Sequence, residues 1–183
     1  MLDMFSDVPL NELETRTEDV LSEKHRFYDI SSIDKEEYLW SQCSNPEIKM
    51  HWGGIRKRVF GTINGLTKSP LVFIDGKVRP FVTWHHAQGA RMADISCLLR
   101  HYPFVSSFSD KVEDAVRTGR YGFKVDDEYK AYAKTLQEKK RVAFKTESAQ
   151  RFVGLEPVID ARFLIVSVNY QEWVSKHSDD HRS

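Results

Sequence analysis

The stretch VSSFSDKVEDAVRTGRYG, residues 105–122, is where the chain changes from strand-like to helical patterning. Apolar and small residues recur there at a spacing of roughly 3.6 positions, which is typical of one face of a helix. The residues on this face are Phe108, Val112, Ala115, Val116 and Gly119. Ser107, with Asp110 three positions later, predicts a capped beginning, and Gly119 predicts the end of the helix.

A second amphipathic stripe follows this helix and predicts another one. Tyr129, Tyr132, Ala133 and Leu136 form the stripe, and Asp126 is suitably placed as its N-cap residue.

Shorter patterns precede and follow the two helices. Strands are expected in MLDMF (1–5), IKMHW (48–52), PLVFIDGKVRPFVTW (70–84, two strands around an Asp-Gly turn) and ISCLL (95–99). Near the end, TESAQRFVGL (146–155) looks helical, Pro157 is expected to break that helix, and RFLIVSV (162–168) fits either a strand or a buried helix. Strands first and helices later predict an α/β fold with a mixed sheet.

The composition is that of a globular protein: of 183 residues, 40% are hydrophobic, 12% aromatic and 30% charged. This length predicts a single domain over residues 1–177, followed by a polar tail at 178–183. The 27 basic residues balance the 27 acidic ones, so the chain as a whole is not a polyanion binder. Nucleic acid is therefore not an expected partner, and any basic site has to be local.

The two cysteines, Cys43 and Cys97, match neither a disulfide framework nor a zinc motif, and two reduced thiols are expected. Cys97 falls in an apolar run and is expected in the core. No signal peptide and no apolar window near the length of a membrane span is present in the sequence. The predicted location is the cytoplasm, either free or peripheral at the inner membrane face, without a transmembrane segment.

Positive charge gathers in MHWGGIRKRVFG, residues 50–61, directly after a glycine pair. Gly53 and Gly54 would let backbone N–H groups approach a ligand, and Arg56 and Arg58 offer planar forks for phosphate or carboxylate oxygens. On a strand Arg56 and Arg58 would share a face, whereas on a helix Arg56 would share one with Phe60. The alternative to an anion site is a solvated basic edge.

Three histidines fall at the ends of predicted strands: His85, His86 and His101. Histidine in such a place can present a metal ligand or a general base, although a satisfied polar residue is an equal alternative. Candidate carboxylates are Asp3, Asp7, Asp75 and Asp94, and candidate stacking aromatics are Trp52 and Trp84.

The collinear order of several elements over roughly residues 1 to 140 resembles the C-terminal half of one branch of the family 2 glycosyltransferases. The elements are LDMFSD, GGIRKRVFG (Gly53, Gly54, Arg56, Arg58, Phe60, Gly61), LTKSPL (Leu66, Lys68, Pro70, Leu71), WHHA, LLRHYPFVSSFSDKV (His101, Tyr102, Phe108, Lys111) and EYKAYAKTL. This resemblance implies a GT-A, or Rossmann-like, fold.

The resemblance also implies an activity, in which a sugar passes from a nucleotide-diphosphate donor to a glycan or another hydroxyl acceptor, as in polysaccharide biosynthesis. It implies a divalent metal, manganese or magnesium, with His86 or His101 as a ligand. Arg56 and Arg58 would lie near the diphosphate or an acidic acceptor, with Gly53, Gly54, Lys68 and Trp84 also in the substrate site. A carboxylate would serve as the base, and Asp75 and Asp94 are the candidates.

Family members carry an Asp-x-Asp motif, which holds metal and donor, before the equivalent of LDMFSD, and this sequence contains no Asp-x-Asp. The resemblance therefore covers an incomplete domain, and three explanations stay open: the product of a truncated or split gene, a fragment, or a domain whose N-terminal half comes from a separate chain. The alternative function is a non-catalytic domain that binds an anionic ligand or a glycan.

Overall fold

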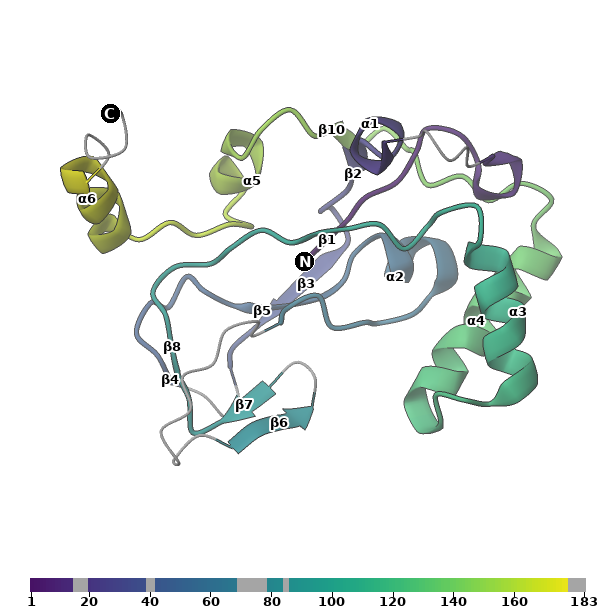
Figure 1. Ribbon diagram of the computed structural model, residues 1–183, viewed down its shortest axis with the longest axis horizontal. Helices are drawn as coiled ribbons and strands as arrows, with labels where there is room; N and C mark the ends of the chain where they lie inside the picture. Colours follow the sequence, from purple (N-terminus) through teal and green to yellow (C-terminus); the bar gives the residue numbers. More distant parts are fainter. Residues whose placement is uncertain (15–19, 39–41, 69–78, 84–85, 178–183) are drawn as a thin grey trace. The chain divides into compact units, whose positions relative to one another are not determined.

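The computed structural model describes residues 1–14, 20–38, 42–68, 79–83 and 86–177, which form α/β structure with small sheets (Figure 1). The chain divides into two units. The first unit consists of Met1–Asp34, His51–Leu66 and Leu99–Phe152, and the second of Lys35–Met50, Thr67–Leu98 and Val153–Ser183.

The first unit is built from short strands and from most of the helices. Its elements are β1 (Leu2–Asp3), η1 (Leu10–Glu12), α1 (Leu21–Lys24), β2 (Phe27–Tyr28), α2 (Ile55–Phe60), β9 (Arg100–His101), α3 (Phe108–Thr118), α4 (Phe123–Glu138) and β10 (Gln150–Arg151). Two further strands, β3 (Ile33–Glu36) and β5 (Met50–Gly53), contain points at which the chain passes from one unit to the other.

Strands β1 and β9 pair in parallel, and this pairing sets the geometry of the candidate site. Its register places Leu2 opposite Arg100 and Asp3 opposite His101. Backbone hydrogen bonds continue the pairing, since the N–H of Met4 donates to the His101 carbonyl at 2.7 Å. The strand expected in residues 1–5 is thus confirmed. Antiparallel pairing of β2 with β10 and a bridge between Phe5 and Phe27 complete this small framework.

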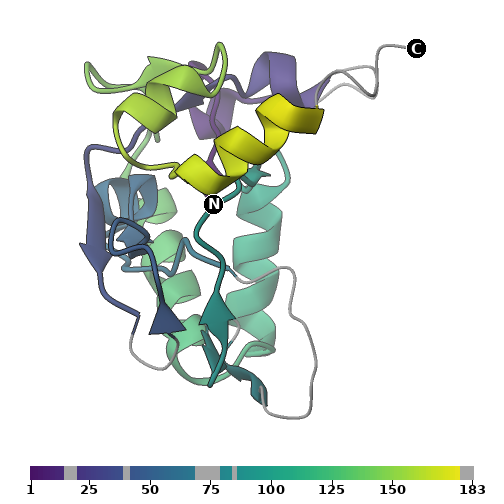
Figure 2. The same cartoon turned by 90° about the vertical axis from the view of Figure 1, so that its left-hand side faces the viewer.

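Helices α3 and α4 confirm the two predicted helices and pack against each other, as Figure 2 shows. Ser107 is the N-cap residue of α3, although its side chain makes no capping hydrogen bond, and Gly119 ends the helix in the left-handed conformation at φ 60°. The expected start of α4 at Asp126 is wrong. Gly122 is the N-cap residue, and Asp126 lies in the first turn. There the positive end of the helix dipole interacts favourably with an acidic side chain.

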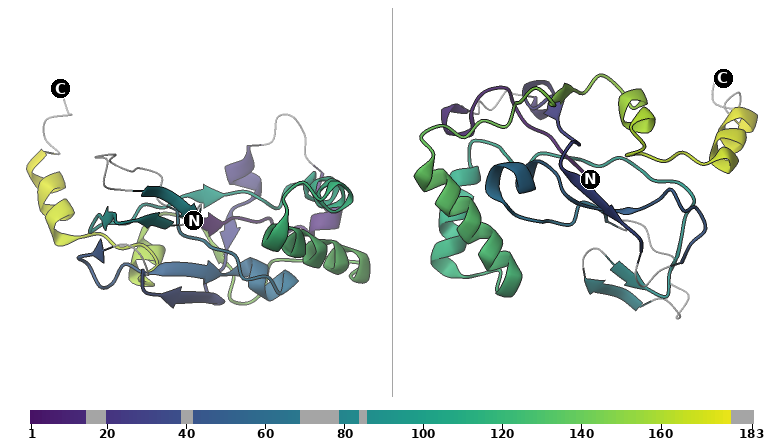
Figure 3. Two further views of the ribbon diagram at one scale, coloured as in Figure 1. Left: turned by 90° about the horizontal axis from the view of Figure 1, so that it is seen from below. Right: turned by 180° about the vertical axis from the view of Figure 1, so that it is seen from behind.

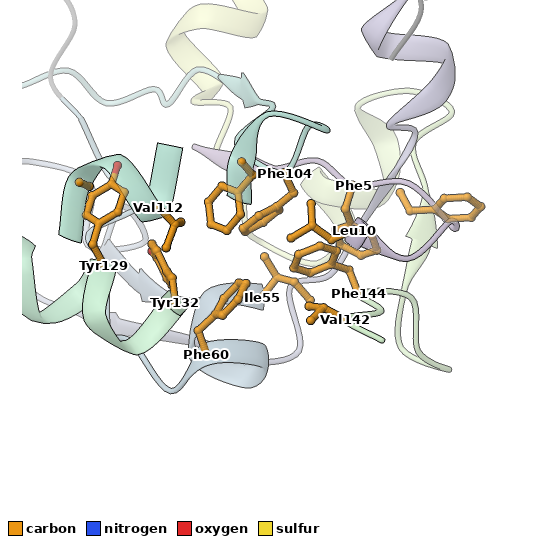
Figure 4. Packing of buried hydrophobic residues seen from close by; sticks show 13 residues of the cluster. Phe5, Leu10, Ile55, Phe60, Phe104, Val112, Tyr129, Tyr132, Val142 and Phe144 are labelled. Carbon is orange, nitrogen blue, oxygen red and sulfur yellow. The ribbon is translucent and has the colours of Figure 1, made fainter. Parts of the chain in front are cut away.

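An aromatic core joins α2, α3 and α4 to the segments around β1 (Figure 4). Phe60 is at its centre: its ring centroid lies 4.7 Å from that of Tyr132 and 5.9 Å from that of Phe104. Phe104 in turn stacks on Phe144 at 4.2 Å. Burial of several large rings removes much apolar surface from water, which makes this cluster the main source of stability in the unit.

Within GGIRKRVF, residues Ile55–Phe60 form a helix, α2, so Arg56 and Arg58 do not lie on a strand. Arg56 and Phe60, four residues apart, therefore share a face, and Phe60 anchors that face in the core. Gly54 precedes the helix at φ 65° and ψ −145°, a conformation open mainly to glycine, and Gly61 ends it in the left-handed region at φ 73°.

Within its described residues, the second unit contains two strand pairs and two helices. Strand β4 (Gln42–Cys43) pairs in parallel with β8 (Arg91–Met92). Strand β6 (Arg79–Thr83) pairs antiparallel with β7 (His86–Gln88), and Figure 3 shows this hairpin in its right panel. Helix α5 spans Glu156–Asp160, and α6 spans Val168–His177 with no buried residue. None of the helices in the described residues has the length and apolarity needed to cross a membrane.

Several expectations for this unit are wrong. Residues 95–99 form no strand, Leu99 is 52% exposed, and Cys97 is exposed instead of lying in the core. Two hydrogen-bonded contacts hold this segment: Ser96 exchanges hydrogen bonds with Ile165 at 2.9 and 2.7 Å, and the Leu99 carbonyl accepts one from the Leu2 N–H at 2.8 Å.

The C-terminal expectations also need correction. Residues 146–155 hold the short strand β10 and no helix, and Pro157 lies in the first turn of α5, where its missing N–H costs no helical bond. Phe163, Leu164 and Ile165 are buried in a turn that is neither strand nor helix. The strand expected at 48–52 is confirmed as β5, the second strand of the 70–84 hairpin as β6, and the Asp-Gly turn lies outside the described residues.

Candidate functional site

Three charged or polar side chains from distant parts of the chain meet at the ends of β1, β9 and α2. The guanidinium of Arg56 donates two hydrogen bonds to Asp3, from Nε to Oδ2 at 2.7 Å and from Nη2 to Oδ1 at 3.0 Å. His101 Nδ1 lies 2.7 Å from Asp3 Oδ1. Asp3 is 53 residues from Arg56 and 98 from His101 in sequence, so the fold alone brings the three together.

The protonation of this cluster follows from its contacts. Burial raises the pKa of Asp3, but the Arg56 charge and the hydrogen bonds from His101 and Arg56 outweigh burial and hold the pKa below its ordinary value. An ionised carboxylate can only accept, so His101 must donate its Nδ1–H to Asp3. The remaining nitrogen, Nε2, is then the one that binds a metal ion or accepts a proton in neutral imidazole. This arrangement is typical of carboxylate–histidine pairs at metal and acid–base sites.

Arg56 also faces Glu128 on α4. Arg56 Nη1 lies 3.5 Å from Glu128 Oε1, and the hydroxyl of Tyr132 donates to the same oxygen. The Arg56 side chain is 12% exposed and that of Asp3 is 3% exposed, so both charges are largely removed from water and depend on each other. Burial raises the pKa of Tyr132, which keeps its hydroxyl protonated as a donor.

A cavity of about 220 Å³ adjoins this cluster within the first unit. Arg56 and His101 line it on the cluster side, and α3 and α4 supply most of the rest. The lining residues from the two helices and the segment between β9 and α3 are Tyr102, Pro103, Val105, Ser107, Phe108, Lys111, Glu128, Tyr129 and Tyr132. The cavity therefore combines aromatic rings with both signs of charge.

Arg58 has a different environment and does not line this cavity. It pairs with the buried carboxylate of Asp29 and donates to the Phe144 carbonyl at 2.7 Å. Thr146 and Ser148 accept hydrogen bonds from Arg58 at 2.8 and 3.0 Å. Burial raises the pKa of Asp29, but hydrogen bonds from Ser148 and Ser31 and the Arg58 charge lower it overall. Arg58 thus links α2 to the segment after α4.

The two glycines before α2 have their backbone N–H groups engaged within the same unit. The N–H of Gly53 donates to the Asn64 carbonyl and that of Gly54 to the Ser32 carbonyl, each at 2.9 Å. A Cβ atom at Gly54 would lie 3.2 Å from Leu66 Cδ1, so a side chain would be crowded there. The positive φ of Gly54 also disfavours any residue with a side chain. These observations assign both glycines to positioning α2.

The other predicted site residues fall in the second unit. Asp94 accepts a hydrogen bond from Asn169 at 2.9 Å, Lys68 is exposed, and His86 begins β7. Asp75, Trp84 and His85 lie outside the described residues. The cluster in the first unit therefore contains two of the predicted site residues, Arg56 and His101, together with Asp3, one of the candidate carboxylates.

In the part of the chain that the structure describes, no three or more His, Cys, Asp or Glu side chains gather as a metal site would require. His101 fits a metal ligand by its chemistry, since Asp3 fixes its tautomer, but it supplies one coordination position. A resident metal would need further ligands.

The sequence did not identify Glu128 and Tyr132 as site residues. Ser107 was predicted only as the cap of the first helix, and Lys111 was named only as part of the LLRHYPFVSSFSDKV element. Glu128 and Tyr132 are four residues apart, and this spacing on a predicted helix was the available signal that they share a face. Nothing in the sequence indicated that this face lies beside Arg56.

Comparison of the chain with protein-family models, with curated proteins and with solved structures finds no match.

Proposed function

We propose that the chain is the acceptor-side half of a family 2 glycosyltransferase, which transfers a sugar from a nucleotide-diphosphate donor to a hydroxyl acceptor. In this proposal the two units belong to an incomplete GT-A domain. A separate polypeptide with the Asp-x-Asp motif would complete the donor site.

One observation carries the proposal. Three of the elements on which the resemblance rests, LDMFSD, GGIRKRVFG and LLRHYPF, converge on the hydrogen-bonded cluster of Asp3, Arg56 and His101. A transferase half would need residues from distant parts of its sequence to meet at one substrate site.

The roles of the cluster follow from its chemistry. Arg56, held by Asp3, is a fixed positive charge that would stabilise the negative charge that develops on the leaving diphosphate. Asp3 holds His101 in the tautomer that leaves Nε2 available. A divalent ion, when bound, would neutralise diphosphate oxygens, and His101 would hold it together with ligands from the completing half and the donor.

The test is a calorimetric titration of the chain with uridine and guanosine diphosphates, with and without manganese. The expected result is metal-dependent binding of one nucleotide once a half with the Asp-x-Asp motif is supplied, weakened about tenfold or more by His101→Ala because one coordinating nitrogen is lost. The control is His177→Ala, since His177 lies on α6 in the second unit and contacts the Trp173 carbonyl.

Two outcomes would count against the assignment. Nucleotide binding that His101→Ala leaves unchanged would remove His101 from the metal site. If neither nucleotide binds, with or without manganese, and a supplied Asp-x-Asp half does not restore binding, the transferase proposal fails.

A further inference from the structure

The size of the cavity beside Arg56 restricts what it can hold. Its volume of about 220 Å³ lies below the roughly 300–1,000 Å³ of pockets that enclose drug-sized ligands. A nucleotide sugar is a ligand of that larger class. A single sugar ring, which is much smaller, is compatible with the available space.

The lining of the cavity suits a sugar in chemical terms. Tyr102, Phe108 and Tyr129 offer ring surfaces, which pack on the apolar C–H face of a pyranose. Glu128 is an acceptor, while Lys111 and Ser107 are donors for the hydroxyl groups around the edge of the ring.

The charges of the cavity favour an uncharged ligand. Arg56 pairs with both Asp3 and Glu128, and Lys111 is a second positive lining group, so two positive side chains stand against two negative ones. With no net charge left over from these pairs, neither a phosphate nor a carboxylate is required to balance the site. Hydroxyl groups can serve both Lys111 and Glu128.

Resting on the proposed function, we infer that this cavity binds the terminal neutral sugar of the acceptor glycan, with Glu128 accepting a hydrogen bond from a sugar hydroxyl. Arg56 and Tyr132 both contact Oε1 of Glu128, and the sugar hydroxyl would donate to Oε2. A hydroxyl held by a carboxylate is positioned as general-base chemistry requires.

The inference is tested by NMR titration of the isotope-labelled chain with the methyl glycosides of glucose, galactose and mannose. The expected result is saturable shifts for one glycoside, centred on amides between Tyr102 and Lys111 and around Glu128. Glu128→Ala is expected to weaken binding about tenfold or more, because a charged hydrogen bond is lost. Glu128→Gln, which retains an acceptor for Tyr132, is expected to weaken it several-fold.

Asp127→Ala is the matched control, because Asp127 is the preceding residue of α4 and its side chain is 79% exposed. Its affinity for the glycoside is expected to equal that of the wild type. If circular dichroism shows that Glu128→Ala does not fold, the affinity of Glu128→Gln is compared with that of the wild type instead.

The outcomes separate this inference from the proposed function. Glycoside binding at the cavity, with no nucleotide binding even after an Asp-x-Asp half is supplied, would support a saccharide-binding domain and remove the transferase. Nucleotide binding without glycoside binding at high millimolar concentration would overturn the inference alone. Shifts caused by inorganic phosphate but by no glycoside would also overturn it, in favour of an anion site.

Discussion

At the scale of residues, the candidate site depends on one buried carboxylate. Asp3 accepts from Arg56 and His101, and its ionised form is what gives both partners their orientation. Removal of one member of such a buried pair leaves the other charge without compensation, which typically costs about 3–5 kcal/mol. The residues of the site therefore stabilise the fold as well.

The lowered pKa of Asp3 predicts acid sensitivity. The unfolded carboxyl has the ordinary value of 3.8 and the folded one a lower value, so between them the unfolded state binds more protons. This contribution to stability is complete above pH 3.8 and is lost as the pH falls through the folded pKa. In urea denaturation at several pH values, Asp3→Asn should be less stable at neutral pH and should lose less stability in acid than the wild type does.

Asp127→Asn is the exposed control for this experiment and should follow the wild-type pH profile. The pKa of Asp29 is also lowered, so the stability of the Asp3→Asn variant should still fall in part as the pH is lowered. Identical acid profiles for the wild type and Asp3→Asn would show that Asp3 is not the ionised centre of the cluster.

At the scale of elements, the sequence predicted those with long-range periodicity and missed those set by tertiary contacts. Helix α3 was predictable because its apolar stripe repeats and Gly119 ends it. The ISCLL segment has the composition of a strand, but its backbone hydrogen bonds to Ile165 and Leu2 are isolated and form no strand, and its apolar residues stay partly exposed. At the site, Arg56 and His101 were identifiable from residue chemistry, whereas Glu128 depends on how α4 packs near α2.

The glycine before α2 is expected to be the more sensitive of the two that flank this helix. Gly54→Ala places a Cβ atom 3.2 Å from Leu66 in a backbone conformation that disfavours side chains, and should lower the unfolding free energy by roughly 1–3 kcal/mol. Gly61→Ala meets nothing within 4 Å and should cost about 1 kcal/mol from the left-handed backbone alone.

Thermal and urea unfolding of the two glycine variants provide the measurement. A larger loss for Gly61→Ala than for Gly54→Ala would show that the turn before α2 adapts easily. It would also weaken the view that the glycine pair is present to position Arg56.

At the scale of the whole molecule, stability is expected to be uneven. The aromatic core lies in the first unit, where α3 and α4 contribute buried residues, while α6 of the second unit buries none and leaves Trp173 56% exposed. Elements with few buried contacts open with small free energies.

Hydrogen exchange followed by mass spectrometry should therefore show slow exchange in α3 and α4 and fast exchange in α6. Peptides of β1 and β9 should resemble α3, because their pairing closes the Asp3 cluster. Protection of α6 equal to that of α4 would contradict this prediction and would mean that another surface covers α6 in solution.

The parallel pairing of β1 with β9 has a consequence for the order of events during synthesis. Asp3 leaves the ribosome before its partner His101, which follows 98 residues later. Contacts between such distant residues slow folding, since a long loop must close before they form. During translation β1 must wait for β9, and the nascent polypeptide exposes apolar residues such as Leu2 and Phe5 during that interval. Chaperones that bind emerging hydrophobic segments would then have more time to act on this chain than on one whose first strand pairs locally.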